Sequence, residues 1–366
     1  MNSIPEQRRG NLLTWYDQNR RTMPWREEGS AYRTWVSEIM LQQTRVDTVI
    51  PYFERFMTAF PTVQDLAHAP LDDVLVLWAG LGYYSRARNL HACAGVVVNQ
   101  HGGTFPETAS ELMKLPGVGR YTAGAIASIA FGEAAPLVDG NVIRVFSRWE
   151  DLEEDVSETA TKKTLWEWAE AWVPDDRPGD YNQALMELGA IVCTPRNPSC
   201  GECPVQMHCA SRKAGTIADR PVKKRRTKVR EETVHAAFLE GPSGAILMGK
   251  RKPEGLFGGL WELPQHWGGL DGGKAGFQKW LRTELEVDCS LRGAPVSVSH
   301  ILSHRRLKIA VHSGVCEKED APRVLDPYDD VRWVTPDELS GLGTGTVTRK
   351  MLSARGGQQE LDWGED

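Results

Sequence analysis

The sequence has no long apolar segment. No window approaches the roughly 18 apolar residues that a membrane-spanning helix requires, and no apolar stretch typical of a secretion signal follows the opening MNSIPEQRRG. We therefore expect a cytoplasmic protein with no membrane contact. A chain of 366 residues also exceeds what one small core usually serves, so we expect two domains.

The chain also lacks an excess of positive charge. Its formal net charge is −6, which by itself does not favour a polyanionic partner. Residues 231–366 carry 16 Lys and Arg against 21 Asp and Glu, a difference of −5, so the remaining residues account for only −1. Because net charge governs solubility and steering rather than local phosphate binding, the first 230 residues can still offer a basic surface to nucleic acid.

Cysteine is scarce, and four of the seven cysteines lie close together. They follow the pattern Cys-x6-Cys-x2-Cys-x5-Cys at Cys193, Cys200, Cys203 and Cys209. A disulfide framework is not expected in a long chain without a secretion signal. Zinc sites typically use two short cysteine pairs separated by a longer loop, whereas this compact loop suits a single cubane cluster. A zinc ion or free thiols are the alternatives. Arg196, between the first two cysteines, is placed to approach a phosphate.

The hydrophobic pattern changes along the chain and indicates two domains. Through residues 1–210, apolar residues recur at spacings of three and four, as in YRTWVSEIMLQQTRV, which predicts amphipathic helices. Residues 211–232 are polar and charged and are expected to be a linker, whose KKRR run is more often a solvated face than a binding patch. Residues 233–366 contain β-rich segments such as VSVSHILS and one helical stretch, AGFQKWLRTELEV, which predicts a mixed α+β domain.

The segment LPGVGRYT at residues 115–122 lies between two helical stretches. Glycines such as Gly117 and Gly119 let backbone N–H groups converge on one oxygen, and the start of the next helix adds a favourable partial charge. Such a hairpin binds phosphate without reading base sequence. A G-x-G pattern alone is more often only a turn.

Two carboxylates are candidates for acid–base chemistry. Glu38 lies among apolar neighbours in the segment SEIMLQQT, and Asp139 lies in PLVDGNVIRV, where small residues meet a new helix. Taken singly, a helical glutamate is usually a solvated surface residue, and an aspartate in this position is usually a helix cap. The functional interpretation therefore depends on the two residues acting together.

These segments, in this order, resemble the MutY family of adenine DNA glycosylases, within the endonuclease III-like helix-hairpin-helix superfamily. The likeness covers nearly the whole chain and includes the motifs S-E-x-M-L-Q-Q-T and V-D-G-N-V. It implies an all-α helix-hairpin-helix glycosylase domain with a [4Fe–4S] loop, plus an α+β nudix-like C-terminal domain. It also implies a bacterial enzyme acting at the nucleoid, a monomer, and a substrate of double-stranded DNA containing an adenine:8-oxoguanine mispair.

The resemblance also implies roles for four residues. Glu38 would act as the general acid toward adenine N7 and later help to activate water, and Asp139 would stabilise the sugar cation or bond to it transiently. This is the two-carboxylate logic of glycoside hydrolysis. Tyr121 and Asn141 would orient these carboxylates. Bifunctional relatives carry a lysine at the position of Tyr121, and a tyrosine cannot form a Schiff base. We therefore expect base removal by water without strand cutting.

Because a base inside a duplex is unreachable, it must be flipped into a pocket. Matching positions place one group of residues at the adenine pocket or the nearby DNA: Arg21, Met23, Trp25, Arg26 and Gln183. Gln43 and Tyr83 would wedge into the base stack. For Trp25 and Tyr83, an ordinary place in the hydrophobic core is the alternative.

The C-terminal domain resembles the lesion-recognition domain of the same family, itself related to nudix hydrolases, through the segment GLFGGLWELP. Its helix offers only Arg282, Glu284 and Glu286, without the adjacent acidic pair that a magnesium-binding nudix site requires. The family's Phe-Ser-His loop, which senses 8-oxoguanine, corresponds here to Leu302 followed by Ser303 and His304. The polar pair is present, and the aromatic residue is replaced by leucine.

Three other functions compete with adenine excision. One is a glycosylase of the same scaffold acting on another mismatch, such as thymine opposite guanine, which the C-terminal domain disfavours. Another is a cluster-bearing DNA-binding protein without activity, against which the presence of both Glu38 and Asp139 argues. The last is a nucleotide hydrolase, which the missing acidic pair disfavours.

Overall fold

The structure is a computed structural model that describes residues 3–26, 30–224, 229–302 and 305–355. The chain divides into two compact units. The first unit consists of Met1–His68 and Asn89–Arg225, and the second consists of Ala69–Arg88 and Arg226–Asp366. No helix in the described part of the chain is both long and apolar enough to span a membrane.

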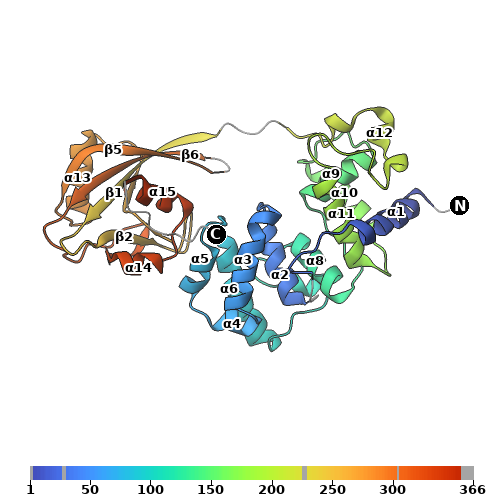
Figure 1. Ribbon diagram of the computed structural model, residues 1–366, viewed down its shortest axis with the longest axis horizontal. Helices are drawn as coiled ribbons and strands as arrows, with labels where there is room; N and C mark the ends of the chain where they lie inside the picture. Colours follow the sequence, from blue (N-terminus) through green and yellow to red (C-terminus); the bar gives the residue numbers. More distant parts are fainter. Residues whose placement is uncertain (1–2, 27–29, 225–228, 303–304, 356–366) are drawn as a thin grey trace. The chain divides into compact units, whose positions relative to one another are not determined.

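The first unit is helical, and its described residues contain no strand. Its α-helices, coloured blue to yellow-green in Figure 1, are α1 (Ile4–Asn19), α2 (Ala31–Leu41), α3 (Val46–Ala59), α4 (Val63–His68), α6 (Ser85–His101, which begins in the second unit), α7 (Ala109–Leu112), α8 (Arg120–Phe131), α9 (Gly140–Trp149), α10 (Thr159–Trp172), α11 (Pro178–Ile191) and α12 (Ala210–Ala214). The all-α prediction for this part of the chain is confirmed.

Local signals define where these helices begin. Ser3 caps α1 in a capping box with Glu6, and Ser30 caps α2 by accepting from the Arg33 N–H. Buried residues of α1, α8, α9 and α11 then pack into one core, which includes Tyr16, Phe146 and Leu188. This core holds the helices that carry the candidate site in a fixed arrangement.

The second unit contains a seven-stranded sheet among its described residues. The strands are β1 (Arg230–Glu240), β2 (Ile246–Arg251), β3 (Trp261–Glu262), β4 (Gln265–Trp267), β5 (Ser290–Ile301), β6 (Arg305–Val315) and β7 (Tyr328–Val334). The order is β3-β2-β1-β6-β5, with β4 paired to β1 and β7 paired to β2. Only the β1–β6 pairing is parallel among these pairs.

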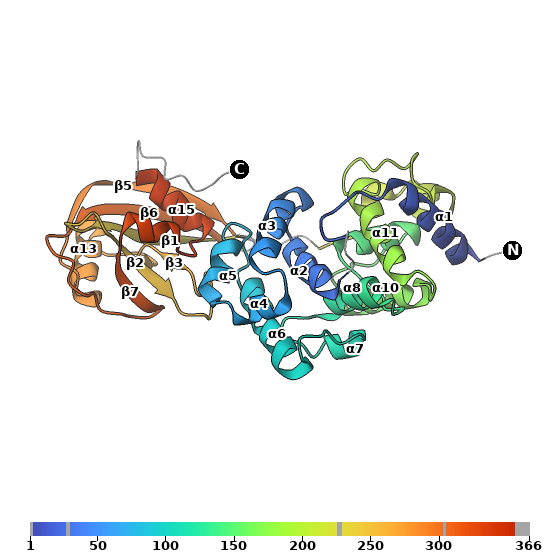
Figure 2. The ribbon, with the colours of Figure 1, turned by 60° about the horizontal axis from the view of Figure 1, so that its bottom comes forward.

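Helices cover the sheet of the second unit on two faces. Phe277 and Leu281 of α13 (Gly273–Glu284) pack into one core, and Leu339 of α14 (Pro336–Ser340) packs into another with Met351 of α15 (Thr346–Arg355). Figure 2 shows α13 and α15 beside this sheet. The helix α5 (Leu71–Trp78) groups with this unit as well. The predicted α+β class of the C-terminal domain is confirmed.

The segment 211–232, expected to be a linker, contains helical residues near its start and strand residues at its end. It begins inside α12, continues through the 3-10 helix Ile217–Asp219, and ends inside β1. Arg220 is buried and its Nε lies 2.9 Å from Asp151 Oδ1, so the early part of the segment packs onto the first unit. Composition alone did not reveal this packing, because charged side chains of the segment pair with residues that are distant in the sequence.

Candidate active site and iron–sulfur loop

Glu38 lies in the middle of α2 and is only 5% exposed. Its Oε2 accepts a hydrogen bond from Tyr121 Oη, which comes from the first turn of α8. Burial raises the pKa of Glu38 to about 7, although the hydrogen bond from Tyr121 opposes the rise. Burial also raises the pKa of Tyr121 well above its ordinary value, so this phenol stays protonated and remains a donor. The carboxyl can therefore hold a proton near neutral pH.

Asp139 caps α9, and its carboxylate is bound on both oxygens. Oδ1 accepts from the backbone N–H groups of Asn141 and Val142 at 2.9 and 2.8 Å, and Oδ2 accepts from Asn141 Nδ2 at 2.9 Å. Burial raises the pKa of Asp139 above its ordinary value, although these hydrogen bonds oppose the rise. The helix N-terminus and three donors thus support the ionised form in a site that would otherwise disfavour it.

Sequence reasoning missed Arg144, which links Asn141 to the cysteine loop. Its guanidinium donates to Asn141 Oδ1 at 2.8 Å, to Gly189 O at 2.7 Å and to Cys193 O at 2.7 Å. A Cβ at Gly189 would lie 2.6 Å from the Asn141 Cβ, so glycine is required where α11 approaches α9. The sequence could have indicated Arg144, because it follows Asn141 by three residues and therefore lies on the same face of the helix.

One cavity of about 320 Å³ brings together the four predicted catalytic residues and five of the residues predicted to bind substrate or DNA. It is lined by Arg21, Met23, Trp25, Arg26, Glu38, Tyr121, Asp139, Asn141 and Gln183. Trp25 is buried and packs edge-on against Phe53 with ring centroids 5.4 Å apart, so it is both a core aromatic and a cavity wall. The two carboxylates and the proposed base-binding residues therefore face one space.

Glu187, which sequence reasoning also missed, lies in this cavity on α11. It accepts from Arg21 Nε at 2.6 Å and from Arg26 Nη2 at 3.1 Å. Burial alone would raise the pKa of Glu187, but the two arginines outweigh it and lower that pKa. The sequence could have indicated Glu187, because it follows Gln183 by four residues and both side chains therefore lie on one face of the helix.

The hairpin between α7 and α8 has the shape that its glycines predict. Gly117 has a φ of 72°, and a Cβ there would lie 2.6 Å from the Asn89 Cβ. Gly119 is the N-cap of α8 with a φ of −87°, and a Cβ there would meet nothing within 4 Å. Only Gly117 therefore needs glycine for conformational reasons, while Gly119 leaves the helix start open.

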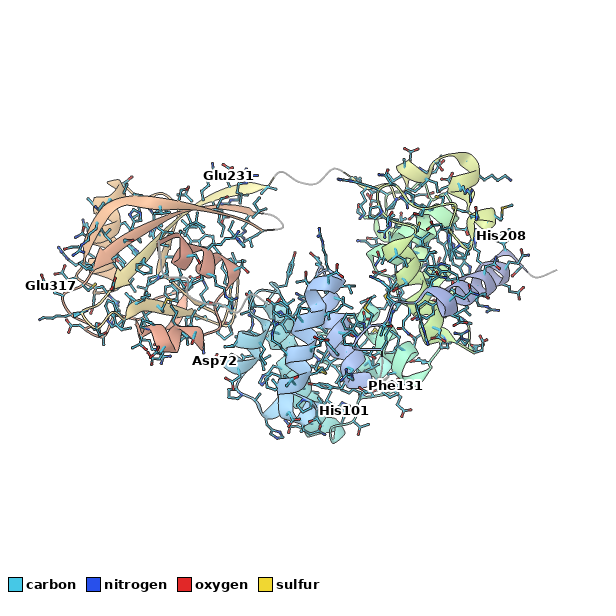
Figure 3. All side chains as sticks on the ribbon, viewed as in Figure 1. Asp72, His101, Phe131, His208, Glu231 and Glu317 are labelled. Carbon is cyan, nitrogen blue, oxygen red and sulfur yellow. The ribbon has the colours of Figure 1, made fainter. Side chains whose placement is uncertain are left out.

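The four clustered cysteines line one small cavity together with Trp149 and Arg212. Arg148 Nη1 donates to the Cys193 Sγ at 3.3 Å, and Arg8 donates to His208 O at 2.6 Å within the same loop, where Figure 3 labels His208. Four sulfur donors around one space fit an iron–sulfur cluster, which thiolates hold. Arg196 is exposed on this loop, as expected for a residue near DNA.

Gln43 and Tyr83, which were also predicted to contact the DNA, do not line this cavity. Gln43 follows α2 with a φ of 60°, and Tyr83 in the second unit has a φ of 49°. Tyr83 is 47% exposed, which removes the core alternative for it. Ser303 and His304 lie outside the described residues. Their neighbour Leu302 packs against the core under α15, and its N–H donates to Arg305 O at 2.8 Å.

The acidic residues of the C-terminal helix do not gather into a metal-binding array. Glu284 ends α13, and Glu286 lies beyond it, 3.7 Å from Arg323 Nη1. Arg282 Nη2 contacts Asp288 Oδ1 at 2.6 Å. Arg282 and Glu286 thus belong to ordinary surface ion pairs.

Comparison with known proteins agrees with this geometry. A family model described as an HhH-GPD superfamily base excision DNA repair protein matches residues 36–171. A model of the iron–sulfur binding domain of endonuclease III matches residues 193–209, and a NUDIX domain model matches residues 235–354. A structure of a thermostable thymine-DNA glycosylase is 31% identical, with a TM-score of 0.53, and the match covers 58% of this chain and 97% of that chain.

The helical fold, the hairpin and the cysteine loop define a base excision DNA repair protein with a [4Fe–4S] loop and a nudix-like domain. The adenine DNA glycosylase of Homo sapiens is 39% identical over 407 residues, covering 96% of this chain and 74% of the human protein. That of Schizosaccharomyces pombe is 33% identical, covering 92% and 87%. The chain belongs to the adenine DNA glycosylase family, so the predicted class of DNA repair enzyme is confirmed.

Proposed function

We propose that this enzyme removes adenine mispaired with 8-oxoguanine, or with guanine, by hydrolysing the N-glycosidic bond and leaving the strand intact. The observation that carries the proposal is the buried Glu38, hydrogen-bonded to Tyr121 in a cavity that Asp139 also lines. The family membership supports adenine as the excised base. DNA is the substrate class that the helix-hairpin-helix scaffold binds.

The cavity residues suggest the order of proton movements. Glu38, protonated because burial raises its pKa, donates its proton to adenine N7. The bond between C1′ and N9 then breaks, and adenine leaves as a neutral base. Asp139 faces the cationic sugar and stabilises it, and water adds at C1′ while its proton passes to the Glu38 carboxylate. Glu187, with Arg21 and Arg26, supplies polar groups that can orient the flipped base.

Tyr121 supports a monofunctional reaction. Its phenol offers no amine for a Schiff base at C1′, so the enzyme has no route here to covalent strand cleavage. Its hydroxyl instead donates a hydrogen bond to Glu38 Oε2. We assign Cys193, Cys200, Cys203 and Cys209 as the ligands of the cluster, which holds this loop in shape when bound.

Single-turnover kinetics of Glu38→Gln test the chemistry. Loss of a positioned general acid is expected to lower the rate by about 10²–10⁴-fold. Glu111→Gln is the matched control, because this glutamate is half exposed and lies outside the cavity. A Glu38→Gln rate near that of the wild type would contradict the assignment.

A duplex panel tests specificity and the fate of the strand. Duplexes carry adenine opposite 8-oxoguanine, guanine or thymine, and a further duplex carries thymine opposite guanine. We expect alkali-dependent breaks at adenine, fastest opposite 8-oxoguanine. Breaks without alkali would contradict a monofunctional reaction, and preferred cleavage at thymine would favour the alternative glycosylase. A Ser303→Ala, His304→Ala double variant should lose the preference for 8-oxoguanine over guanine.

A further inference from the structure

Two cysteines of the second unit face each other at one end of the β5–β6 hairpin. Cys289 directly precedes β5, Cys316 directly follows β6, and the first ladder pair inside them is Ser290 with Val315. In an antiparallel pair, facing Cα atoms are about 4.5–5.5 Å apart. A disulfide requires Cα atoms about 4.4–6.8 Å apart, a range that includes both types of ladder pair. Cys289 and Cys316 each lie one position beyond the last ladder pair, and a hydrogen bond joins their side chains.

The two thiols also share one environment. Both cysteines are 5% exposed and belong to the core under α13. A hydrogen bond from the Cys316 thiol lowers the pKa of Cys289, and the charge of Arg282 acts in the same direction, against burial and Asp288. The same hydrogen bond raises the pKa of Cys316. Cys289 is therefore the more readily ionised sulfur, with the second thiol beside it.

We propose that Cys289 and Cys316 form a reversible redox pair that hydrogen peroxide converts into a disulfide. The Cys289 sulfur attacks one peroxide oxygen, the O–O bond breaks, and sulfenic acid and one water form. The Cys316 sulfur then attacks the sulfenic sulfur, the S–O bond breaks, and a second water leaves with the remaining thiol proton. A dithiol reverses the reaction by thiol–disulfide exchange and becomes oxidised itself.

The position of the pair determines what oxidation would change. The ladder between β5 and β6 is interrupted between Arg292 and Val296, where Gly293 has a φ of 59°. Residues 290–292 therefore form a short paired segment between this irregularity and the cysteines. A disulfide would close that segment covalently and slow the opening of its hydrogen bonds.

The opposite end of the hairpin lies at Leu302 and Arg305, where the Leu302 N–H donates to Arg305 O. Glu231 of β1 pairs with Arg306 at that end, and Glu317 follows Cys316 directly. Figure 3 labels both glutamates, which mark the two ends of the sheet. The redox pair therefore lies at one end of β5 and β6. At their other end, these two strands lead to the segment that contains Ser303 and His304.

Peptide mapping of the full-length protein with its cluster in place tests the pair. Reduced protein is treated with hydrogen peroxide, alkylated, digested and analysed by mass spectrometry. We expect one cross-linked peptide joining Cys289 to Cys316, lighter by two hydrogen atoms than the two reduced peptides, and full recovery of both thiols with dithiothreitol. Both cysteines remaining free for alkylation, or passing to sulfonic acid without a cross-link, would overturn the proposal.

Matched variants identify the participating sulfurs. Cys289→Ser and Cys316→Ser should each abolish the cross-link, whereas Cys93→Ala should retain it because Cys93 is buried in α6 of the first unit. Hydrogen exchange of residues 290–292 and 313–315 should slow on oxidation in the wild type and stay unchanged in either serine variant. Equal exchange in the oxidised and reduced wild type would remove the proposed effect on the hairpin.

A redox titration without peroxide tests the same pair and does not expose the cluster to that oxidant. The protein is equilibrated in graded ratios of reduced to oxidised dithiothreitol, and the cross-linked fraction is measured. A single two-electron transition is expected for the wild type and for Cys93→Ala. A wild-type protein with no cross-link at any ratio would contradict the redox pair, whatever the outcome of the glycosylase assays.

Discussion

Tyr121 Oη donates a hydrogen bond to Glu38 Oε2 across 83 positions of sequence, joining the first turn of α8 to the middle of α2. The bond has two opposing effects on the proposed acid. It fixes the orientation of the Glu38 carboxyl, and it favours the ionised form, so it lowers a pKa that burial has raised. Activity and its pH dependence should therefore respond differently when the phenol is removed.

The wild-type enzyme should lose activity as pH rises above about 7. Glu38 must be protonated to donate to adenine, and its raised pKa of about 7 means that the protonated fraction falls through that pH. The kcat/KM profile of the free enzyme checks this. A single acid with a pKa of about 7 titrates within about pH 6 to pH 9. A flat profile over this range would contradict the assignment of Glu38 as the acid.

Tyr121→Phe should shift the alkaline limb of that profile to higher pH. Removing a donor that favours the carboxylate raises the pKa of Glu38, while the ring continues to pack. We expect a rate loss of about 10–100-fold at neutral pH, since a hydrogen bond to a charged group contributes about 1.5–3 kcal/mol. A limb that stays in place while the rate falls would indicate a different role for Tyr121.

Asp139→Asn and Asp139→Ala should separate the catalytic role from the capping role. Asparagine caps helices about as well as aspartate, so Asp139→Asn should retain stability but lose the charge that stabilises the sugar cation. Asp139→Ala should lose both, with a cost of about 0.5–2 kcal/mol in stability. Urea unfolding and single-turnover rates measure the two effects. Full activity of Asp139→Asn would contradict the electrostatic role.

The sequence allowed much of this architecture to be predicted because its signals are local. Helical periodicity, the cysteine spacing and the Gly117 hairpin each depend on residues a few positions apart, and the structure has the expected helices and turn. The motifs around Glu38 and Asp139 allowed residues that line the cavity to be predicted, but not the contacts between them.

The contacts that were missed join residues distant in sequence. Glu187 meets Arg21 across 166 positions, and Arg144 meets Cys193 across 49. Periodicity does not encode such pairs, because they depend on how helices pack. The order in residues 211–220 escaped prediction for the same reason, since Asp151 is the partner that buries Arg220.

Arg144→Lys should weaken both the cysteine loop and the site. A lysine keeps the charge but cannot donate at once to Asn141, Gly189 and Cys193. Each buried acceptor left without a donor costs about 1–3 kcal/mol, so we expect lower thermal stability and slower adenine release. Arg55→Lys on the exposed face of α3 is the control. If the two variants behaved alike, Arg144 would have no linking role.

Gly117→Ala and Gly119→Ala should have unequal effects although they lie two residues apart. At Gly117 alanine must adopt a φ of 72° and place its Cβ 2.6 Å from the Asn89 Cβ. The left-handed conformation alone costs about 1–2 kcal/mol. At Gly119 the φ is −87° and the added Cβ meets nothing within 4 Å, so the cost should stay below about 1 kcal/mol.

DNA affinity provides the second measurement on this pair. A hairpin that binds phosphate should lose affinity in Gly117→Ala equally for mismatched and fully paired duplexes, because phosphate contacts carry no sequence information. The dependence of affinity on salt concentration should also become shallower, since fewer counterions are released. Gly119→Ala should lose less than about 1 kcal/mol of fold stability. Equal losses of stability in the two variants would show that the positive φ of Gly117 is not what the hairpin requires.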